Sequence, residues 1–198
     1  MKKDKIIIYY PDPHDYIWNE EIQKIMPYCF GKGLDVGCGG RSINKEIKRL
    51  DIDPENKPDI VASADNIPVK NASFDYLIAQ HLFEHFEDQE KLLKEFARVI
   101  RPGGYILIVH PDVEFTKKQT EEKYNPETAT LSHNKHFHEV TQAQFGKFIK
   151  SKQKLGFKVL EIGKAYPTWS FYVILRVNKD HSPTLSKSPG QDDIEAKT

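Results

Sequence analysis

Short apolar stretches alternate with helical patterns along most of this 198-residue chain, and this alternation restricts the fold more than any other feature. Between residues 88 and 100, apolar side chains at 92, 93, 96, 99 and 100 have the spacing of one helix face. Residues 105–109 form an uninterrupted apolar run, which is typical of a strand covered on both faces. Strands that alternate with helices form βαβ units. The sequence therefore predicts an α/β fold with a doubly wound, mostly parallel sheet and helices on both faces.

Apolar runs and turn signals indicate seven strands in this sheet. They are expected at residues 34–36, 48–52, 60–62, 74–79, 105–109, 157–162 and 171–177. The Arg-Pro-Gly-Gly sequence at 101–104 predicts a stop for the preceding helix and a turn before the next strand. Thr141 and Gln144 have capping-box spacing, which predicts a further helix that ends near Gly156.

The chain is expected to form one domain over residues 31–177. An N-terminal arm at 1–30 precedes it, with a short helix expected at 20–26, and a disordered tail at 178–198 follows it. Residues 111–135 form a long polar loop, and loops of that length are usually functional or disordered.

Composition narrows the function classes. Lys and Arg together number 29, as do Asp and Glu, so the formal net charge is zero and no global field attracts nucleic acid or an anionic membrane. No stretch approaches the roughly 20 apolar residues that span a bilayer. The two cysteines are too few for a disulfide framework and lack zinc-ligand spacing. These features indicate a cytosolic protein with no membrane partner.

A glycine-rich turn follows the first expected strand, in the sequence Leu-Asp-Val-Gly-Cys-Gly-Gly at residues 34–40. Glycines let a backbone adopt positive φ and approach a ligand closely. In a doubly wound sheet, ligands bind beyond the carboxyl ends of the strands. The turn is therefore where a cofactor is expected, although a tight turn without a ligand has the same local signal.

Acidic residues at successive strand ends strengthen this interpretation. Asp51 closes the second strand and is suited to accept hydrogen bonds from two ribose hydroxyls, while Asp65, after the third, is suited to an adenine amino group. Asp35 lies within the first strand, where a buried carboxylate is costly unless it is paired. It is suited to the ammonium group of a bound amino acid. Together the three carboxylates favour a ligand that joins adenosine to an amino acid.

Six segments in this order resemble the class I S-adenosylmethionine (SAM)-dependent methyltransferases, and most closely those with a ubiquinone/menaquinone-biosynthesis-like core. The resemblance is strong over residues 33–110 and looser over 136–177. The segments are Leu34-Asp35-Val36-Gly37-Cys38-Gly39, Asp51-Ile52-Asp53-Pro54, Ala64-Asp65-Asn66-Ile67-Pro68, Ser73-Phe74-Asp75, His81-Leu82-Phe83-Glu84-His85 and Arg98-Val99-Ile100-Arg101-Pro102-Gly103-Gly104. The resemblance implies a Rossmann-like fold, SAM as cofactor and methyl transfer by direct displacement.

The resemblance also implies roles for individual residues. Asp35 and the turn residues Gly37, Cys38 and Gly39 correspond to the part that holds the methionine moiety of SAM. Asp51 corresponds to the ribose-binding acid, with Ile52 against the adenine. The remaining contacts are expected from Asp65 and Asn66 at the adenine edge and from Gln80 and His81 at the end of the fourth strand.

Two departures from the family pattern concern the glycine turn. Arg41 occupies the position of the usual third glycine, and ten residues separate Gly40 from Asp51, so the first helix must be shortened or lost. Arg41 is suited to a charge-assisted bond with the cofactor carboxylate, and an arginine that faces solvent remains an equal alternative.

The sequence does not single out a catalytic base, and methyl transfer needs one only if the acceptor must lose a proton. The candidates are His81, His110, His136 and His138, together with Asp112, His133 and Glu139. A metal site is a further interpretation of one stretch, because of the spacing of His133, His136, His138 and Glu139. No second set of ligands accompanies this stretch in the sequence. We therefore expect no metal, and a lid hinge is the alternative for this stretch.

Two other functions compete with methyl transfer. A nicotinamide-dependent oxidoreductase would carry G-x-G-x-x-G/A after the first strand, whereas Ser42 occupies the third position here. A SAM-binding scaffold without activity would not require Asp35, Asp51 and Asp65. The acceptor is expected to be a small molecule, with a protein side chain or an RNA base as alternatives. The methylated atom and the oligomeric state stay open.

Overall fold

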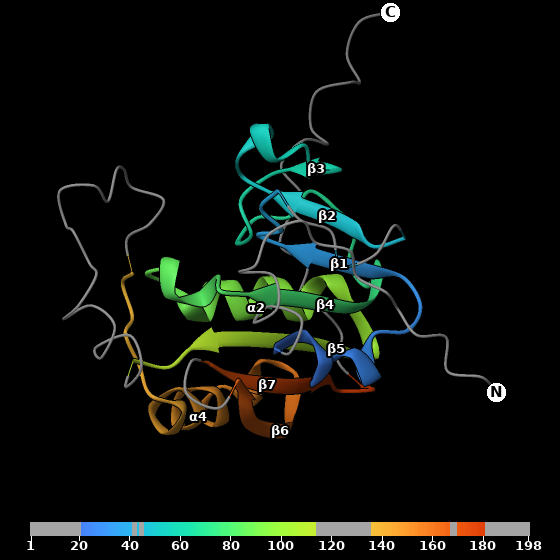
Figure 1. Cartoon of the computed structure of the whole chain (residues 1–198). Coiled ribbons are helices and arrows are strands. Elements are labelled where there is room, and N and C mark those ends of the chain that lie inside the picture. Colours follow the sequence, from blue (N-terminus) through green and yellow to red (C-terminus); the bar gives the residue numbers. More distant parts are fainter. Residues whose placement is uncertain (1–20, 41–42, 44–45, 114–135, 167–169, 181–198) are drawn as a thin grey trace, which may run out of the picture.

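Seven strands form one sheet in the computed structural model, which describes residues 21–40, 43, 46–113, 136–166 and 170–180 (Figure 1). The sheet order is β3-β2-β1-β4-β5-β7-β6. Strands β1 to β5 pair in parallel, and β7 is antiparallel to both β5 and β6. The strands are β1 (Gly33–Val36), β2 (Lys48–Asp51), β3 (Ile60–Val61), β4 (Phe74–Gln80), β5 (Ile100–Pro111), β6 (Phe157–Tyr166) and β7 (Ser170–Val177). The predicted α/β fold and its seven strands are confirmed.

The two long helices among the described residues begin where the sequence predicts. In α2 (Gln89–Val99), the side chain of the N-cap Asp88 accepts a hydrogen bond from the backbone N–H of Lys91. In α4 (Gln142–Ser151), the predicted capping box is present, with Thr141 and Gln144 each accepting from the other's backbone N–H. Gly156, at φ +100°, ends the short 3-10 helix η5 (Gln153–Leu155) that follows α4.

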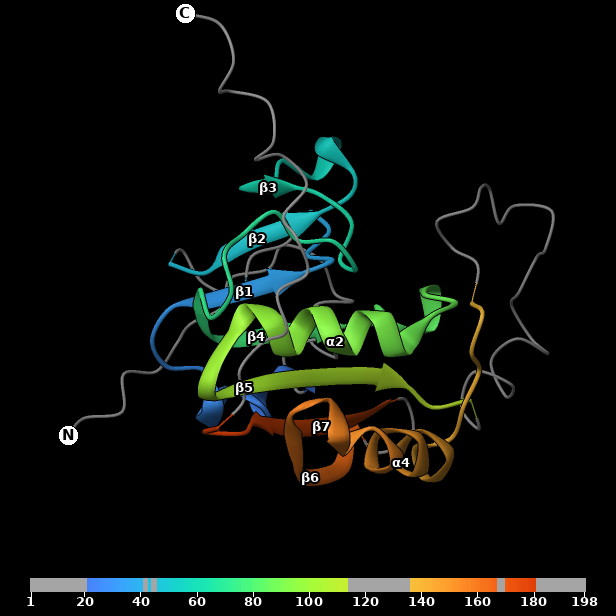
Figure 2. The ribbon, with the colours of Figure 1, turned by 180° about the vertical axis from the view of Figure 1, so that it is seen from behind.

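The two faces of the sheet are covered differently. Both α2 and α4 lie on one face, which is turned toward the viewer in Figure 2. They bury the larger apolar core, which includes Phe96 and Phe145. The opposite face carries a second core to which Ile22 and Ile25 contribute, next to the 3-10 helix η1 (Met26–Tyr28). The described end of the predicted N-terminal arm is therefore part of the packed structure.

The sequence between α2 and β5 differs from the prediction. The Arg-Pro-Gly-Gly turn expected at 101–104 lies within β5, which begins directly after the helix at Ile100. The register passes from Phe74 opposite Ile100 to Tyr76 opposite Tyr105, so the extra residues form an irregularity in the strand. The turn signal was right about the local bend but wrong about the strand boundary.

Other predictions are tested only in part. Residues 37–40, 43 and 46–47, between β1 and β2, form turns and bends, which agrees with a shortened first helix. The short helix expected at 20–26 covers residues 21–23. Residues 1–20, 114–135 and 181–198, which include most of the arm, loop and tail, lie outside the described residues. Among the helices that the structure describes, none is long and apolar enough to cross a membrane.

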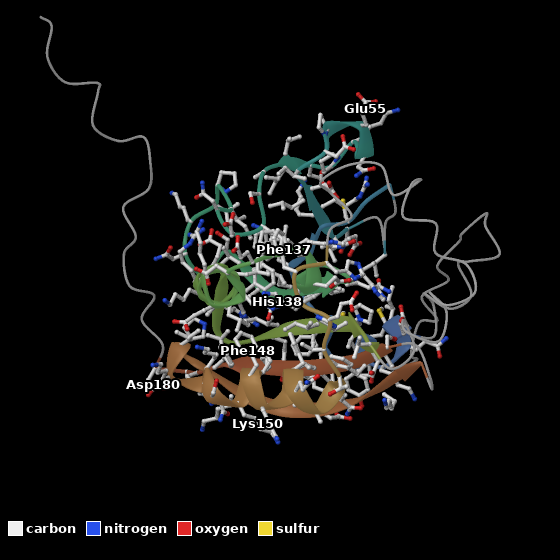
Figure 3. All side chains as sticks on the ribbon, turned by 90° about the vertical axis from the view of Figure 1, so that its left-hand side faces the viewer. Glu55, Phe137, His138, Phe148, Lys150 and Asp180 are labelled. Atoms are coloured by element: carbon white, nitrogen blue, oxygen red, sulfur yellow. The ribbon has the colours of Figure 1, made fainter. Side chains whose placement is uncertain are left out.

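Further elements position the site at the carboxyl edge of the parallel strands. The 3-10 helix η2 (Pro54–Asn56) follows β2, and η3 (Phe83–His85) follows β4. Figure 3 is a view toward this edge, with Phe137 and His138 in front of the middle of the sheet and Glu55 on η2.

Candidate functional site

The glycine turn after β1 has the backbone geometry that the sequence predicts. Gly37 and Gly39 have φ values of +69° and +55°, in the left-handed region that favours glycine. The N–H groups of Gly37 and Cys38 both donate to the carbonyl of Leu50, at 2.8 and 3.1 Å, so the turn is tied to β2. A Cβ at Gly37 would also lie 2.7 Å from Leu82 Cδ1, so the side chain of Leu82 would have to shift to admit it.

Asp51 lies directly against this turn. Its carboxylate is 8% exposed, and its Oδ2 accepts from the N–H of Gly39 at 2.7 Å. Its Oδ1 accepts from the N–H of Asp53 at 2.9 Å. Because an ionised carboxylate has about four acceptor positions, about two remain for a ligand hydroxyl pair. The structure thus brings together the predicted turn and the predicted ribose acid.

Arg49 also holds the glycine turn, a role that was not predicted from the sequence. Its guanidinium donates to the carbonyls of Gly39 at 3.0 Å, Asn56 at 2.9 Å and Lys57 at 3.2 Å. The turn and the loop after η2 are therefore joined through one side chain. The available signal was strand alternation, which puts Arg49 and Asp51 on the same face of β2.

The turn leaves an open space on its outer side. No described atom lies within 4 Å of the position that a Cβ of Gly39 would take, and the nearest to Gly40 is Asn56 Oδ1 at 3.9 Å. A ligand can therefore approach this backbone closely, as the methionine part of SAM requires. The geometry of the turn and of Asp51 fits an adenosyl amino acid.

The residues predicted at the adenine edge lie beyond β2 and β3. Ile52 is 57% exposed, so its side chain is accessible to a flat ring. Asp65 accepts from Ser63 Oγ at 2.6 Å and from Lys91 Nζ at 2.7 Å. Burial acts to raise the pKa of Asp65, but these two hydrogen bonds outweigh it and lower the pKa overall. Asn66 forms a turn with Ser63 through its backbone N–H.

Asp35 is buried within β1, as the sequence suggested, with 5% of its surface exposed. Its negative charge affects the pKa of two neighbouring thiols. Burial, and then the charge of Asp35, raise the pKa of Cys29 to about 12 and help to raise that of Cys38 to about 11. Both thiols are therefore protonated at neutral pH, and neither has the character of a nucleophile.

A buried carboxylate that the sequence analysis missed lies at the end of β4. Glu21 is fully buried, and it accepts from Gln80 Nε2 at 2.9 Å and from the hydroxyl of Ser170. His81 Nε2 lies 3.2 and 3.3 Å from the two carboxylate oxygens of Glu21. The predicted pair of Gln80 and His81 is thus joined to the N-terminal segment and to β7. The helical pattern at 20–26 was visible, but nothing in it marked Glu21 as buried.

The remaining catalytic candidates have different surroundings. His110 is stacked on Phe171 with ring centroids 5.1 Å apart, and its Nδ1 lies 2.8 Å from the carbonyl of Pro111. Burial lowers the pKa of His110, which favours the neutral imidazole. Asp112 is buried and pairs with Lys164 at 3.0 Å. These contacts favour structural roles for both residues.

Of the histidines in the 133–139 stretch, the structure describes His136 and His138, and their rings make different contacts. His136 is exposed and lies beside His85, with ring centroids 5.0 Å apart. His138 donates from Nε2 to the carbonyl of Glu87 at 3.0 Å. His133 and Arg41 lie outside the described residues.

Fold and site together define a class of protein. Residues 34–108 match the family model described as a methyltransferase domain. The SAM-dependent methyltransferase TM1293 of Thermotoga maritima has the same fold, with a TM-score of 0.60, 21% identity, and coverage of 84% of this chain and 90% of that one. Residues 34–108 are therefore a methyltransferase domain, and the fold is that of the class I SAM-dependent methyltransferases, a class whose cofactor is S-adenosylmethionine.

Several curated relatives are similar to part of this chain. The uncharacterized protein MJ1123 of Methanocaldococcus jannaschii is 28% identical over 126 residues, or 57% of this chain and 61% of that protein. The ubiquinone/menaquinone biosynthesis C-methyltransferase UbiE of Campylobacter jejuni is 31% identical over 104 residues, or 52% of this chain and 40% of UbiE. A tRNA methyltransferase of Mus musculus, ALKBH8, is 33% identical over 46% of this chain and 16% of its own length. The chain therefore spans 61% and 40% of the first two relatives.

Proposed function

We propose that this protein transfers the methyl group of SAM to a small-molecule acceptor at the carboxyl edge of β1, β2 and β4. The observation that carries the proposal is the glycine turn, which is open on its outer side and tied on its inner side to the carboxylate of Asp51. A turn that served only to connect two strands would need neither the open face nor the acid. We also predict a cytosolic location, on the basis of composition.

The cofactor supplies an activated methyl group on a sulfonium sulfur, and the residues of the chain mainly bind and orient. Gly39 admits the methionine moiety, and Asp51 accepts from the ribose hydroxyls through its remaining acceptor positions. Asp35 and Asp65 take the ammonium and the adenine amino group, and the latter role requires Asp65 to share its oxygens with Lys91. Alignment of donor and acceptor can supply roughly 7–11 kcal/mol of the barrier without a dedicated catalytic group.

A small-molecule acceptor is supported by the neutral net charge of the chain and by the similarity to UbiE, which is named for quinone biosynthesis. The similarity to the tRNA methyltransferase covers a smaller share of this chain, so RNA is the second candidate.

Asp51→Ala tests the cofactor part of the proposal. The variant loses hydrogen bonds from the ribose to a charged acceptor, so calorimetry with SAM should show binding weaker by about 1–3 kcal/mol. Glu55→Ala is the matched control, because Glu55 is an exposed acid only four residues away, and its affinity should be unchanged. Thermal unfolding of the ligand-free variant separates lost binding from lost folding. Unchanged affinity in a folded Asp51→Ala protein would exclude Asp51 as the ribose acid.

The acceptor class is tested with cell extract and SAM that carries a radiolabelled methyl group. Label in the small-molecule fraction is the expected result. Label in protein or RNA would replace the proposed acceptor, and tight SAM binding with no transfer to any fraction would favour a binding scaffold.

A further inference from the structure

Glu84, the middle residue of η3, carries a buried carboxylate with an incomplete set of partners. Its side chain is 2% exposed, and among the described residues its Oε2 has no hydrogen-bond partner. Its Oε1 lies 3.8 Å from His81 Nδ1 and 4.0 Å from His85 Nε2, both beyond ordinary hydrogen-bond distance. Because a buried charge is costly without a close partner, a further positive group beside Glu84 would stabilise its ionised form.

Two imidazoles lie beside this carboxylate. One nitrogen each of His85 and His136 and one carboxylate oxygen of Glu84 all lie within 4.8 Å of one another. His85 follows Glu84 directly on η3, whereas His136 comes from a segment 51 positions farther along the chain. The rings of the two histidines meet at 70°, edge to face, with their centroids 5.0 Å apart.

Backbone contacts fix the approach of His136. The N–H of Phe137 donates to the carbonyl of Glu84 at 2.7 Å, and His138 donates to the carbonyl of Glu87 at 3.0 Å. Two hydrogen bonds on consecutive residues therefore hold this segment against η3. Figure 3 shows Phe137 and His138 in front of the sheet edge, which places the segment over the carboxyl ends of the strands.

We propose that Glu84, His85 and His136 bind a divalent transition-metal ion, with Zn²⁺ as the ion that fits best. Two imidazoles and one carboxylate are ligands that Zn²⁺ accepts, whereas Ca²⁺ and Mg²⁺ take oxygen ligands. The cation would also neutralise the carboxylate that the fold leaves buried. Three protein ligands leave the fourth tetrahedral position open, beside His81 and the end of β4.

The geometry requires a small contraction. Bonds of 2.0–2.1 Å in a tetrahedral zinc site put ligand atoms about 3.3 Å apart, so atoms that now lie within 4.8 Å of one another must close by at most about 1.5 Å. His136 is exposed, and the side chain of His85 is 26% exposed, so both rings have room to turn toward Glu84. The site uses only one histidine of the 133–139 stretch, which explains why spacing within that stretch did not predict it.

The test is direct titration of the full-length protein, freed of metal with a chelator, and is independent of methyl transfer. Competition between the protein and a chromophoric chelator should give one Zn²⁺ per chain, bound more tightly than about 1 µM. Co²⁺ in the same site should give the intense visible bands of a four-coordinate ion. Glu84→Gln, which removes the charge at nearly constant volume, and His136→Ala should each weaken Zn²⁺ binding at least tenfold.

Glu87→Gln is the matched control, because it makes the same substitution as Glu84→Gln at an exposed acid three residues away, outside the cluster, and should leave Zn²⁺ affinity unchanged. Circular dichroism establishes that each variant is folded. The proposal is overturned if the wild-type chain binds no stoichiometric Zn²⁺, if folded Glu84→Gln and His136→Ala retain full affinity, or if Glu87→Gln loses as much as Glu84→Gln. Loss of zinc binding with SAM affinity intact would support the metal site without bearing on the cofactor pocket.

Discussion

Gly39→Ala separates the part that the glycine turn plays in folding from the part that it plays in binding. At φ +55°, alanine is in the left-handed region, which costs an L residue about 1–2 kcal/mol. The new Cβ would meet no described atom within 4 Å, so sterics add nothing in the free protein. We expect the free energy of unfolding to fall by about 1–2 kcal/mol, the conformational contribution alone.

The same methyl group would occupy the space that we assign to the methionine part of SAM. Affinity for SAM should therefore fall more than tenfold, or by over about 1.4 kcal/mol, in addition to the loss of stability. Gly37→Ala is the comparison. Its φ of +69° carries a similar penalty, but its Cβ would point at Leu82 Cδ1, 2.7 Å away, and so into the protein. The free energy of unfolding should fall further in Gly37→Ala than in Gly39→Ala. The affinity for SAM should fall less in Gly37→Ala than in Gly39→Ala, when each is compared with the variant's loss of stability.

Urea unfolding of both variants measures the free energy of unfolding. Calorimetry with SAM and with its demethylated product measures the affinities. Both ligands share the methionine moiety, so both should lose affinity in Gly39→Ala. The reasoning fails if Gly39→Ala loses the expected stability yet binds SAM like the wild-type protein. In that case the open side of the turn would not be the cofactor side.

Two further predictions concern the residues that support the site. Arg49→Met removes three hydrogen bonds to backbone carbonyls and should lower the free energy of unfolding in urea by at least about 1.5–3 kcal/mol. Lys48→Met, which breaks an exposed ion pair with Asp59, should cost no more than about 1 kcal/mol, and equal losses would contradict a special role for Arg49. His110→Phe should flatten the fall in thermal stability as pH drops below about 6.5, because burial lowers the folded-state pKa of His110 and the unfolded chain gains its proton first. An unchanged slope would show that His110 is not the group responsible.

The strands and helices were predictable because their signals are local. The apolar run at 105–109 and the capping box at Thr141 depend on residues within a few positions of each other. Asp51 was predictable for a related reason, since the end of a parallel strand has a fixed place relative to the glycine turn. The Arg-Pro-Gly-Gly sequence misled because glycine and proline mark a bend, and a bend inside a strand has the same residues as a turn before it.

The supporting residues could not be predicted because their contacts span the chain. Glu21 is 59 positions from Gln80 and 149 from Ser170, and no sequence period links them. Arg49 is polar in a four-residue strand, where solvent exposure is the ordinary expectation for arginine. Its partners are backbone carbonyls, which leave no trace in residue identity.

The surroundings of His81 bear on whether it can act as a catalytic base. It adopts φ +51°, an uncommon conformation for a residue other than glycine, and such strain persists only where surrounding contacts hold it. Its ring lies between two buried carboxylates, with Nε2 near Glu21 and Nδ1 3.8 Å from Glu84. An imidazole held in this way is suited first to fixing the end of β4, where the acceptor must be aligned. A base role for His81 would require it to exchange one of these contacts for the acceptor.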